Sequence, residues 1–241
     1  MTYKEVRGNI FNSKADALVN TVNCVGIMGK GIALEFRRRY PKMFKEYQQV
    51  CKRGELKPGQ IFPYRERETW VLNFAIKNDW KQPSKVEWIE NCLKEFPKIC
   101  ADIGINSVAF PWMGAMNGGI PIEKIKEITR EYLSKGIDMD IEVYDFNPDA
   151  GDHLFEKLNN IANTEPLDIK KLSKKSEIRL NYMDKIIKTI KQKNIKSLPR
   201  FIETGVIGKT NIEKLYSFLI DSETDSKNFY SKTQAPKLSS W

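Results

Sequence analysis

Short apolar runs and amphipathic segments alternate along the chain as far as about residue 149. The short runs have the length and residue types of strands, and the longer segments repeat apolar residues at helical spacing. Strands are predicted at residues 3–6, 17–23, 60–63, 70–74, 107–110 and 141–144, and helices at 32–40, 44–53, 85–103 and 122–134. This alternation predicts the α/β class, with a mixed, mostly parallel sheet that helices cover on both faces.

The run Asn-Pro-Asp-Ala-Gly-Asp at residues 147–152 interrupts the alternation, and the pattern after it is purely helical. Helices are predicted at residues 153–162, 167–193 and 211–220, and the apolar stripe of the second is interpreted as core. Residues 222–241 are polar, a composition typical of a poorly ordered tail. We therefore predict an α/β domain at residues 1–148 and a small helical C-terminal segment with a polar tail at 149–241.

The positive charge of the chain is uneven. The net charge is +9, and residues 151–241 hold 17 Lys and Arg against 11 Asp and Glu, compared with 23 against 20 in residues 1–150. The C-terminal segment is thus the part expected to meet an anionic partner such as nucleic acid. The alternative is a lysine-rich surface that only water contacts.

Cysteine and histidine usage limits the chemistry. The four cysteines form no CxxC pair, and His153 is the single histidine, so neither a histidine-based metal site nor a His-dependent triad is expected. No apolar run approaches the about 20 residues of a membrane span. The N-terminus has the pattern of a strand rather than of a signal peptide. We expect a cytoplasmic protein without a metal, a cofactor or a membrane partner.

Two glycine-rich loops follow predicted strands, at residues 26–31 and 114–119. The first begins after the edge Asn20-Thr21-Val22-Asn23 and leads into the helix at 32–40. Glycines let a phosphate approach the backbone closely, and a helix N-terminus adds N–H groups for it. Loops after parallel strands meet at the carboxyl edge of the sheet, where α/β folds bind ligands. The glycine spacing matches neither GxGxxG nor the P-loop.

Three separate blocks resemble the macrodomain family, the ADP-ribose-binding α/β/α module. They are Arg-Gly-Asn-Ile-Phe at residues 7–11, the run at 20–33, and Ala-Phe-Pro-Trp-Met-Gly-Ala-Met-Asn-Gly-Gly at 109–119. The second block is most similar to DarG-type antitoxin macrodomains, which remove ADP-ribose from DNA, and to the terminal ADP-ribose protein glycohydrolases. The resemblance spans residues 3–146 and implies a three-layer α/β/α fold.

The resemblance also implies a set of site residues. The ADP-ribose contacts that it implies are Asn9, Ile10, Asn20, Asn23, Gly29, Lys30, Gly31, Ile32, Pro111, Gly114, Ala115, Met116, Asn117 and Gly118. Asn9 is implied to contact the adenine side, with the alternative that it only ends a turn after the first strand. Asn23 is implied to orient the distal ribose, since its amide both donates and accepts. Its alternative role is to cap the loop.

Lys77 is the catalytic residue that the resemblance implies, together with Asn23. Its amine would act at the anomeric carbon of the distal ribose, which requires a lowered pKa, here expected from Lys30 and a helix dipole. The alternative is an exposed loop lysine. Met116 stands where similar sequences have glycine, so we expect strain if that position needs a positive φ. Gly118 stands where the terminal glycohydrolases have an aspartate.

These features favour an ADP-ribosyl glycohydrolase that acts on modified DNA and reverses the modification made by a toxin. Two alternatives remain: a non-catalytic binder of ADP-ribose or a signalling nucleotide, and an ADP-ribose 1″-phosphate phosphatase. The expected partners are ADP-ribose or ADP-ribosylated DNA. The segment at 149–241 is a candidate contact for a toxin ADP-ribosyltransferase.

Overall fold

The structure, a computed structural model, describes residues 2–134 and 136–224. These residues divide after Phe146 into two units. The first contains a six-stranded sheet, and the second contains helices only. Their buried apolar residues form separate clusters, so each unit has a hydrophobic core of its own. Within the described residues, no helix combines the length and apolar character needed to cross a membrane.

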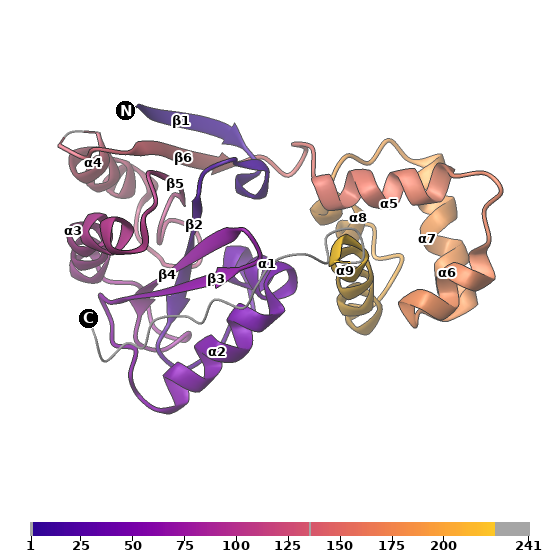
Figure 1. The fold of residues 1–241 in the computed structure, drawn as a ribbon, viewed down its shortest axis with the longest axis horizontal. Coiled ribbons are helices and arrows are strands. Elements are labelled where there is room, and N and C mark those ends of the chain that lie inside the picture. The colour runs from indigo at the N-terminus through magenta and orange to yellow at the C-terminus, as the bar shows by residue number, and fades with distance from the viewer. Residues whose placement is uncertain (1, 135, 225–241) are drawn as a thin grey trace. The chain divides into compact units, whose positions relative to one another are not determined.

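The sheet has the strand order β1-β6-β5-β2-β4-β3 (Figure 1). Its strands are β1 (Tyr3–Gly8), β2 (Ala17–Asn23), β3 (Ile61–Glu66), β4 (Thr69–Lys77), β5 (Ser107–Pro111) and β6 (Asp140–Phe146). All neighbouring pairs are parallel except β3 with β4. The predicted mixed, mostly parallel sheet is confirmed. β4 is longer than predicted, and its last residue is Lys77.

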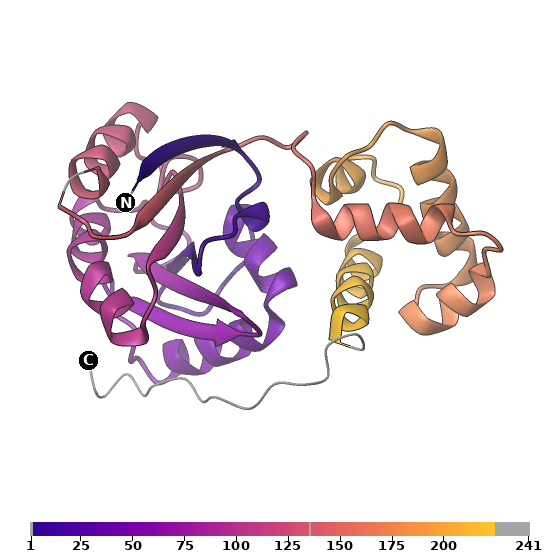
Figure 2. The ribbon, with the colours of Figure 1, turned by 45° about the horizontal axis from the view of Figure 1, so that its top comes forward.

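Helices cover both faces of the sheet, as the alternation predicts (Figure 2). On one face the core contains residues of α1 (Gly31–Arg39) and α2 (Pro41–Lys52). On the other face it contains residues of α3 (Val86–Ile103) and α4 (Ile122–Leu133). Alternate residues of β2 explain the arrangement, because Leu18 packs in the first core and Val19 in the second. The three-layer α/β/α fold is therefore confirmed.

The second unit has five helices within its described residues. They are α5 (His153–Asn163), α6 (Ile169–Ser176), α7 (Leu180–Gln192), α8 (Leu198–Glu203) and α9 (Lys209–Thr224). The single helix predicted at 167–193 is wrong, because Glu177 has a φ of 55° and ends α6. Its carbonyl accepts a hydrogen bond from Lys214 Nζ of α9 at 2.7 Å, so this carbonyl has a partner although the helix ends there. Of the predicted polar tail, residues 222–224 belong to α9, and 225–241 lie outside the described residues.

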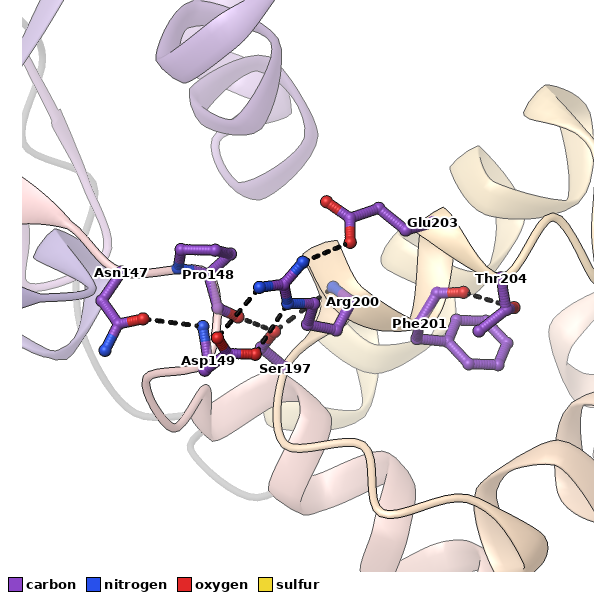
Figure 3. Close-up of polar contacts among 8 residues, drawn as sticks. All are labelled: Asn147, Pro148, Asp149, Ser197, Arg200, Phe201, Glu203 and Thr204. Atoms are coloured by element: carbon purple, nitrogen blue, oxygen red, sulfur yellow. Dashed lines mark hydrogen bonds and ion pairs between the residues drawn. The ribbon is translucent and has the colours of Figure 1, made fainter.

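The start of the helical unit is fixed by side chains of α8 and the residue before it (Figure 3). Arg200 donates two hydrogen bonds to the Asp149 carboxylate, at 2.7 and 2.9 Å. The buried Ser197 hydroxyl donates to the Pro148 carbonyl. The bidentate geometry and the buried hydroxyl bond tie residues 148–149 to the helical unit. The unit thus begins immediately after β6.

Candidate functional site

Five parallel strands end at one edge of the sheet, and the loops that follow them carry the predicted site residues. β2 ends at Asn23, β4 at Lys77 and β5 at Pro111. Asn23 and Lys77 are register partners on neighbouring strands, directly after an irregularity in the β2–β4 pairing. The two catalytic candidates thus lie side by side in the backbone. This edge is where α/β sheets bind ligands.

Asn23 organises the first glycine loop. Its Oδ1 accepts hydrogen bonds from the backbone N–H groups of Val25 and Ile27, at 3.0 and 3.3 Å, and its Nδ2 donates to the Ile27 carbonyl at 2.6 Å. Tyr47 of α2 donates to the Asn23 carbonyl at 2.6 Å. This is the loop-capping arrangement. A ribose contact by the same amide requires that ligand atoms replace or share these bonds.

The first loop leads directly into α1, whose N-terminal end is not capped by the side chain of its N-cap residue. Lys30 is the N-cap residue, and its side chain makes no capping hydrogen bond. The N–H groups of the first helical turn therefore lack a side-chain acceptor, and with the helix dipole they favour an anion. Gly29 and Lys30 are exposed beside this end.

The second glycine loop is held in a tight turn. Gly114 has a φ of 80°. A Cβ on Gly118 would lie 2.6 Å from the Gly114 carbonyl carbon and still closer to its oxygen, so only glycine fits. The Gly118 carbonyl accepts from Ser84 N at 2.9 Å, and the Gly114 carbonyl accepts from Ile120 N at 3.2 Å. These bonds fix the loop against the segment before α3.

Met116 lies at the tip of the second loop and is 84% exposed. Among the described residues, the non-glycine positions with positive φ are Arg67 and Glu177. Met116 has no positive φ, so the strain expected there is absent. Its side chain is free to contact a ligand without a backbone cost.

Lys77, one of the two catalytic candidates, is hydrogen-bonded to the second glycine loop. Its Nζ donates a short hydrogen bond to the Asn117 carbonyl. Partial burial lowers the pKa of Lys77, because removal from water disfavours the ammonium form. The cause is burial, and not the Lys30 charge or the helix dipole expected from the sequence. A neutral amine is thus more accessible at Lys77 than at a fully hydrated lysine.

The two glycine loops approach each other closely. A Cβ on Gly31 would lie 2.5 Å from the Asn117 Nδ2, and Gly31 has a φ of 57°. The absence of a side chain at Gly31 therefore makes room for the Asn117 amide. With Lys77 bonded to the Asn117 carbonyl, residues from β4 and both loops meet at one place.

Three predicted contacts near β1 and β2 have structural partners. Asn9 caps a short 3-10 helix (Ile10–Asn12), and its Oδ1 accepts from Phe11 N at 3.1 Å, so the turn role is present. Asn20 is fully buried, and its Nδ2 donates to Asn73 Oδ1 of β4 at 2.8 Å. Ile10 is buried in the core beside α1. In the structure these three side chains contact neighbouring parts of the domain itself, next to the ends of β1 and β2.

Two exposed aromatic residues near this edge were missed by the sequence analysis. Phe146 ends β6 and is 53% exposed, and Trp80 follows β4 and is 51% exposed. The signal for both was available, since each is an aromatic residue at or shortly after a strand end. Within the described residues, no group of three His, Cys, Asp or Glu side chains has the arrangement of a metal site.

Comparison with known proteins identifies the fold family. The family model of the Macro domain matches residues 19–129. The macrodomain of Mycobacterium tuberculosis DarG is 37% identical and superposes with a TM-score of 0.57, covering 59% of this chain and 97% of that one. The chain belongs to the macrodomain family.

Other macrodomain proteins are also similar. A DNA ADP-ribosyl glycohydrolase of Thermus aquaticus is 38% identical over 144 residues, 58% of this chain and 40% of that protein. Thermosipho africanus DarTG, solved in complex with ADP-ribose, is 30% identical with a TM-score of 0.57, over 60% of this chain and 41% of that one. The chain spans less than half the length of the DNA ADP-ribosyl glycohydrolases that it matches.

Proposed function

We propose that the macrodomain binds ADP-ribose at the carboxyl edge of its sheet and releases it from modified DNA. The observation that carries the proposal is the position of Lys77. Its amine, with a pKa lowered by burial, is bonded to the second glycine loop beside Asn23. The similarity to DNA ADP-ribosyl glycohydrolases supports both the ligand and the reaction.

Backbone groups would hold the diphosphate in this proposal. The uncapped N-terminal end of α1 and the Gly114–Gly119 turn would supply backbone N–H donors to the phosphates. The exposed ring of Phe146 offers the adenine a stacking surface at the end of β6. The distal ribose would then lie toward Asn23 and Lys77.

The chemistry requires a nucleophile with an available lone pair. In its neutral form the Lys77 amine attacks the anomeric carbon of the distal ribose, and the bond to the DNA base breaks as the base takes up a proton. Opening of the ribose ring gives a Schiff base. Water hydrolyses it, which restores the amine and releases ADP-ribose. The lowered pKa of Lys77 increases the fraction of protein molecules in which this amine is neutral, and therefore nucleophilic, near neutral pH.

The test compares three substrates: ADP-ribosylated DNA, ADP-ribosylated protein and ADP-ribose 1″-phosphate. We expect release of ADP-ribose from the DNA by the wild type and none by Lys77→Ala. Lys98→Ala, which removes an exposed lysine of α3, is the matched control and should retain full activity. Turnover of the 1″-phosphate alone would indicate a phosphatase. Binding of ADP-ribose without turnover of any substrate would indicate a non-catalytic binder.

We also propose that the helical unit contacts a toxin ADP-ribosyltransferase, and that the protein acts in the cytoplasm. The resemblance to antitoxin macrodomains supports the first point, and the four unpaired cysteines, typical of a reducing compartment, support the second. The partner proposal predicts that the full chain suppresses the modification of DNA by a transferase more strongly than residues 1–146 do. Equal suppression by both would contradict it.

A further inference from the structure

An exposed tryptophan follows the candidate catalytic lysine in a rigid turn. Trp80 lies three residues after Lys77 and leaves 51% of its surface in water, a large apolar exposure for its type. The turn that carries it is well fixed. Asp79 Oδ1 accepts from Lys81 N at 2.9 Å, and the Asp79 carbonyl accepts from Gln82 N at 3.1 Å.

Both ends of this turn are tied to the glycine loops. Cys24 N, in the first loop, donates to the Asn78 carbonyl at 3.1 Å. Ser84 N donates to the Gly118 carbonyl of the second loop at 2.9 Å. A turn held at both ends presents its side chains with little loss of entropy when a ligand binds. Trp80 is therefore carried by a backbone that is already fixed on both sides of it and tied to both glycine loops.

Lysines accompany the aromatic rings of this segment. Lys81 Nζ lies 5.4 Å from the centroid of the Trp80 ring, and Lys85 Nζ lies 4.8 Å from that of Trp88. Both lysines are exposed, and within the described residues neither forms an ion pair with a carboxylate. The acidic residues of the segment are Asp79, whose side chain holds the turn, and Glu87. Alternating rings and cations are the combination by which proteins bind single-stranded nucleic acid.

The order of the groups in the substrate indicates what this surface meets. If both glycine loops hold the diphosphate and Lys77 faces the anomeric carbon, then the group attached to that carbon leaves on the Lys77 side. The turn with Trp80 is the segment of chain that directly follows Lys77. A nucleobase has a flat π-face that stacks on indole, whereas a protein side chain has none unless it is aromatic.

We propose that residues 80–88 form an acceptor subsite for a single-stranded nucleic acid, in which Trp80 stacks on the base that carries ADP-ribose. Lys81 and Lys85 contact the flanking phosphates. The proposal rests on the proposed function, because it names the substrate class of that same site. It requires a single strand, since a base within a duplex has both faces covered by its neighbours.

The test compares two ligands: free ADP-ribose and a short single-stranded oligonucleotide with one ADP-ribosylated base. Dissociation constants are measured with the full chain carrying Lys77→Ala, and KM is measured with the wild-type lysine. Adding Trp80→Ala should raise both constants for the oligonucleotide about tenfold or more, the usual effect of removing a stacked ring. The affinity for free ADP-ribose should change less than twofold. Trp80→Phe should restore most of the loss.

Phe146→Ala is the matched control, because it removes a similarly exposed ring at the proposed adenine end. It should weaken free ADP-ribose and the modified oligonucleotide by the same factor. Replacing Lys81 and Lys85 by alanine should lower the dependence of oligonucleotide binding on salt, by about 0.7 in the logarithmic slope for each lost phosphate contact. Unmodified oligonucleotide tests the subsite alone, and Trp80→Ala should weaken its binding as well.

The outcomes separate this inference from the proposed function. Absence of ADP-ribose binding by the wild type would overturn the proposed function, while the unmodified oligonucleotide would still test residues 80–88. If Trp80→Ala weakens both ligands equally, the ring belongs to the ADP-ribose site or to the fold, and the acceptor subsite is refuted. The acceptor subsite is also refuted if Trp80→Ala changes the binding of neither the modified nor the unmodified oligonucleotide.

Discussion

Gly118→Ala should open the second glycine loop and abolish tight binding of ADP-ribose. The added Cβ would lie 2.6 Å from the Gly114 carbonyl carbon, whereas ordinary van der Waals contact begins near 3.4 Å. The backbone at Gly118 must therefore move about 1 Å away from the backbone at Gly114, because backbone atoms cannot rotate away as a side chain would. No positive φ is involved at Gly118, so the whole effect comes from this contact.

The magnitude follows from the bonds that the separation would break. The Gly118 carbonyl accepts from Ser84 N, and the Gly114 carbonyl accepts from Ile120 N. Each bond contributes about 0.5–1.5 kcal/mol, so the variant should lose about 1–3 kcal/mol of unfolding free energy. At about 2–4 °C per kcal/mol for a domain of this size, the melting temperature should fall by about 2–12 °C.

Thermal unfolding by circular dichroism measures the first effect, and calorimetry with ADP-ribose measures the second. Gly29→Ala is the matched stability control in the first loop, because its nearest neighbour, a methyl group of Ile27, would lie 3.8 Å from the new Cβ. It should leave the melting temperature unchanged. A Gly118→Ala variant that melts at the wild-type temperature and binds ADP-ribose with wild-type affinity would refute the reasoning.

Four further predictions concern the site and the boundary. Lys77→Ala should abolish release of ADP-ribose while changing ADP-ribose affinity only a few-fold. The wild-type rate should fall as the pH decreases through the lowered pKa of Lys77, because the ammonium has no lone pair. A flat pH–rate profile would contradict a role for the neutral amine. Asn23→Ala should destabilise the domain by about 2–4 kcal/mol in denaturant unfolding, because the N–H groups of Val25 and Ile27 and the Ile27 carbonyl lose their partner. A loss below about 0.5 kcal/mol would show that the loop keeps its structure without the Asn23 side chain. Gly29→Ala should weaken ADP-ribose in calorimetry although the fold tolerates it, and unchanged affinity would mean that no phosphate approaches this residue. Residues 1–146 alone should fold and bind ADP-ribose, because the units have separate cores, and an insoluble fragment would show that the helices complete the domain.

Much of the sheet could be predicted because its signals are local. The apolar run at residues 17–23 and the alternation around it are sufficient to indicate a buried parallel strand, and the glycine loops mark the edge. The break at Glu177 could not be predicted in this way. No glycine or proline stands there, and the bond that stabilises it comes from Lys214 in a distant helix. α8 did carry a local signal, since Ser197 caps it and Pro199 lies in its first turn.

The position of the candidate site could be predicted, but its bonding could not. The resemblance to macrodomains pointed to Asn23, Lys77 and the second loop, and the structure places these residues at one edge of the sheet. Which partner each polar atom takes depends on contacts between loops, so the capping bonds of Asn23 and the Asn117 carbonyl beside Lys77 were not visible in the sequence. The positions of Trp80 and Phe146 at or after strand ends could be read from the sequence, but their exposure depends on the same tertiary contacts and could not.

The contact between Gly31 and the Asn117 amide has a consequence for how such a site can change over generations. Gly31 has a φ of 57°, which strains any side chain at this position, and a Cβ there would also displace the Asn117 amide. The two positions are separated by most of the domain in sequence, yet a side chain at 31 would disturb the loop whose carbonyl bonds to Lys77. Relatives should therefore keep glycine at position 31 even where residue 117 is small, because the backbone conformation alone selects against a side chain.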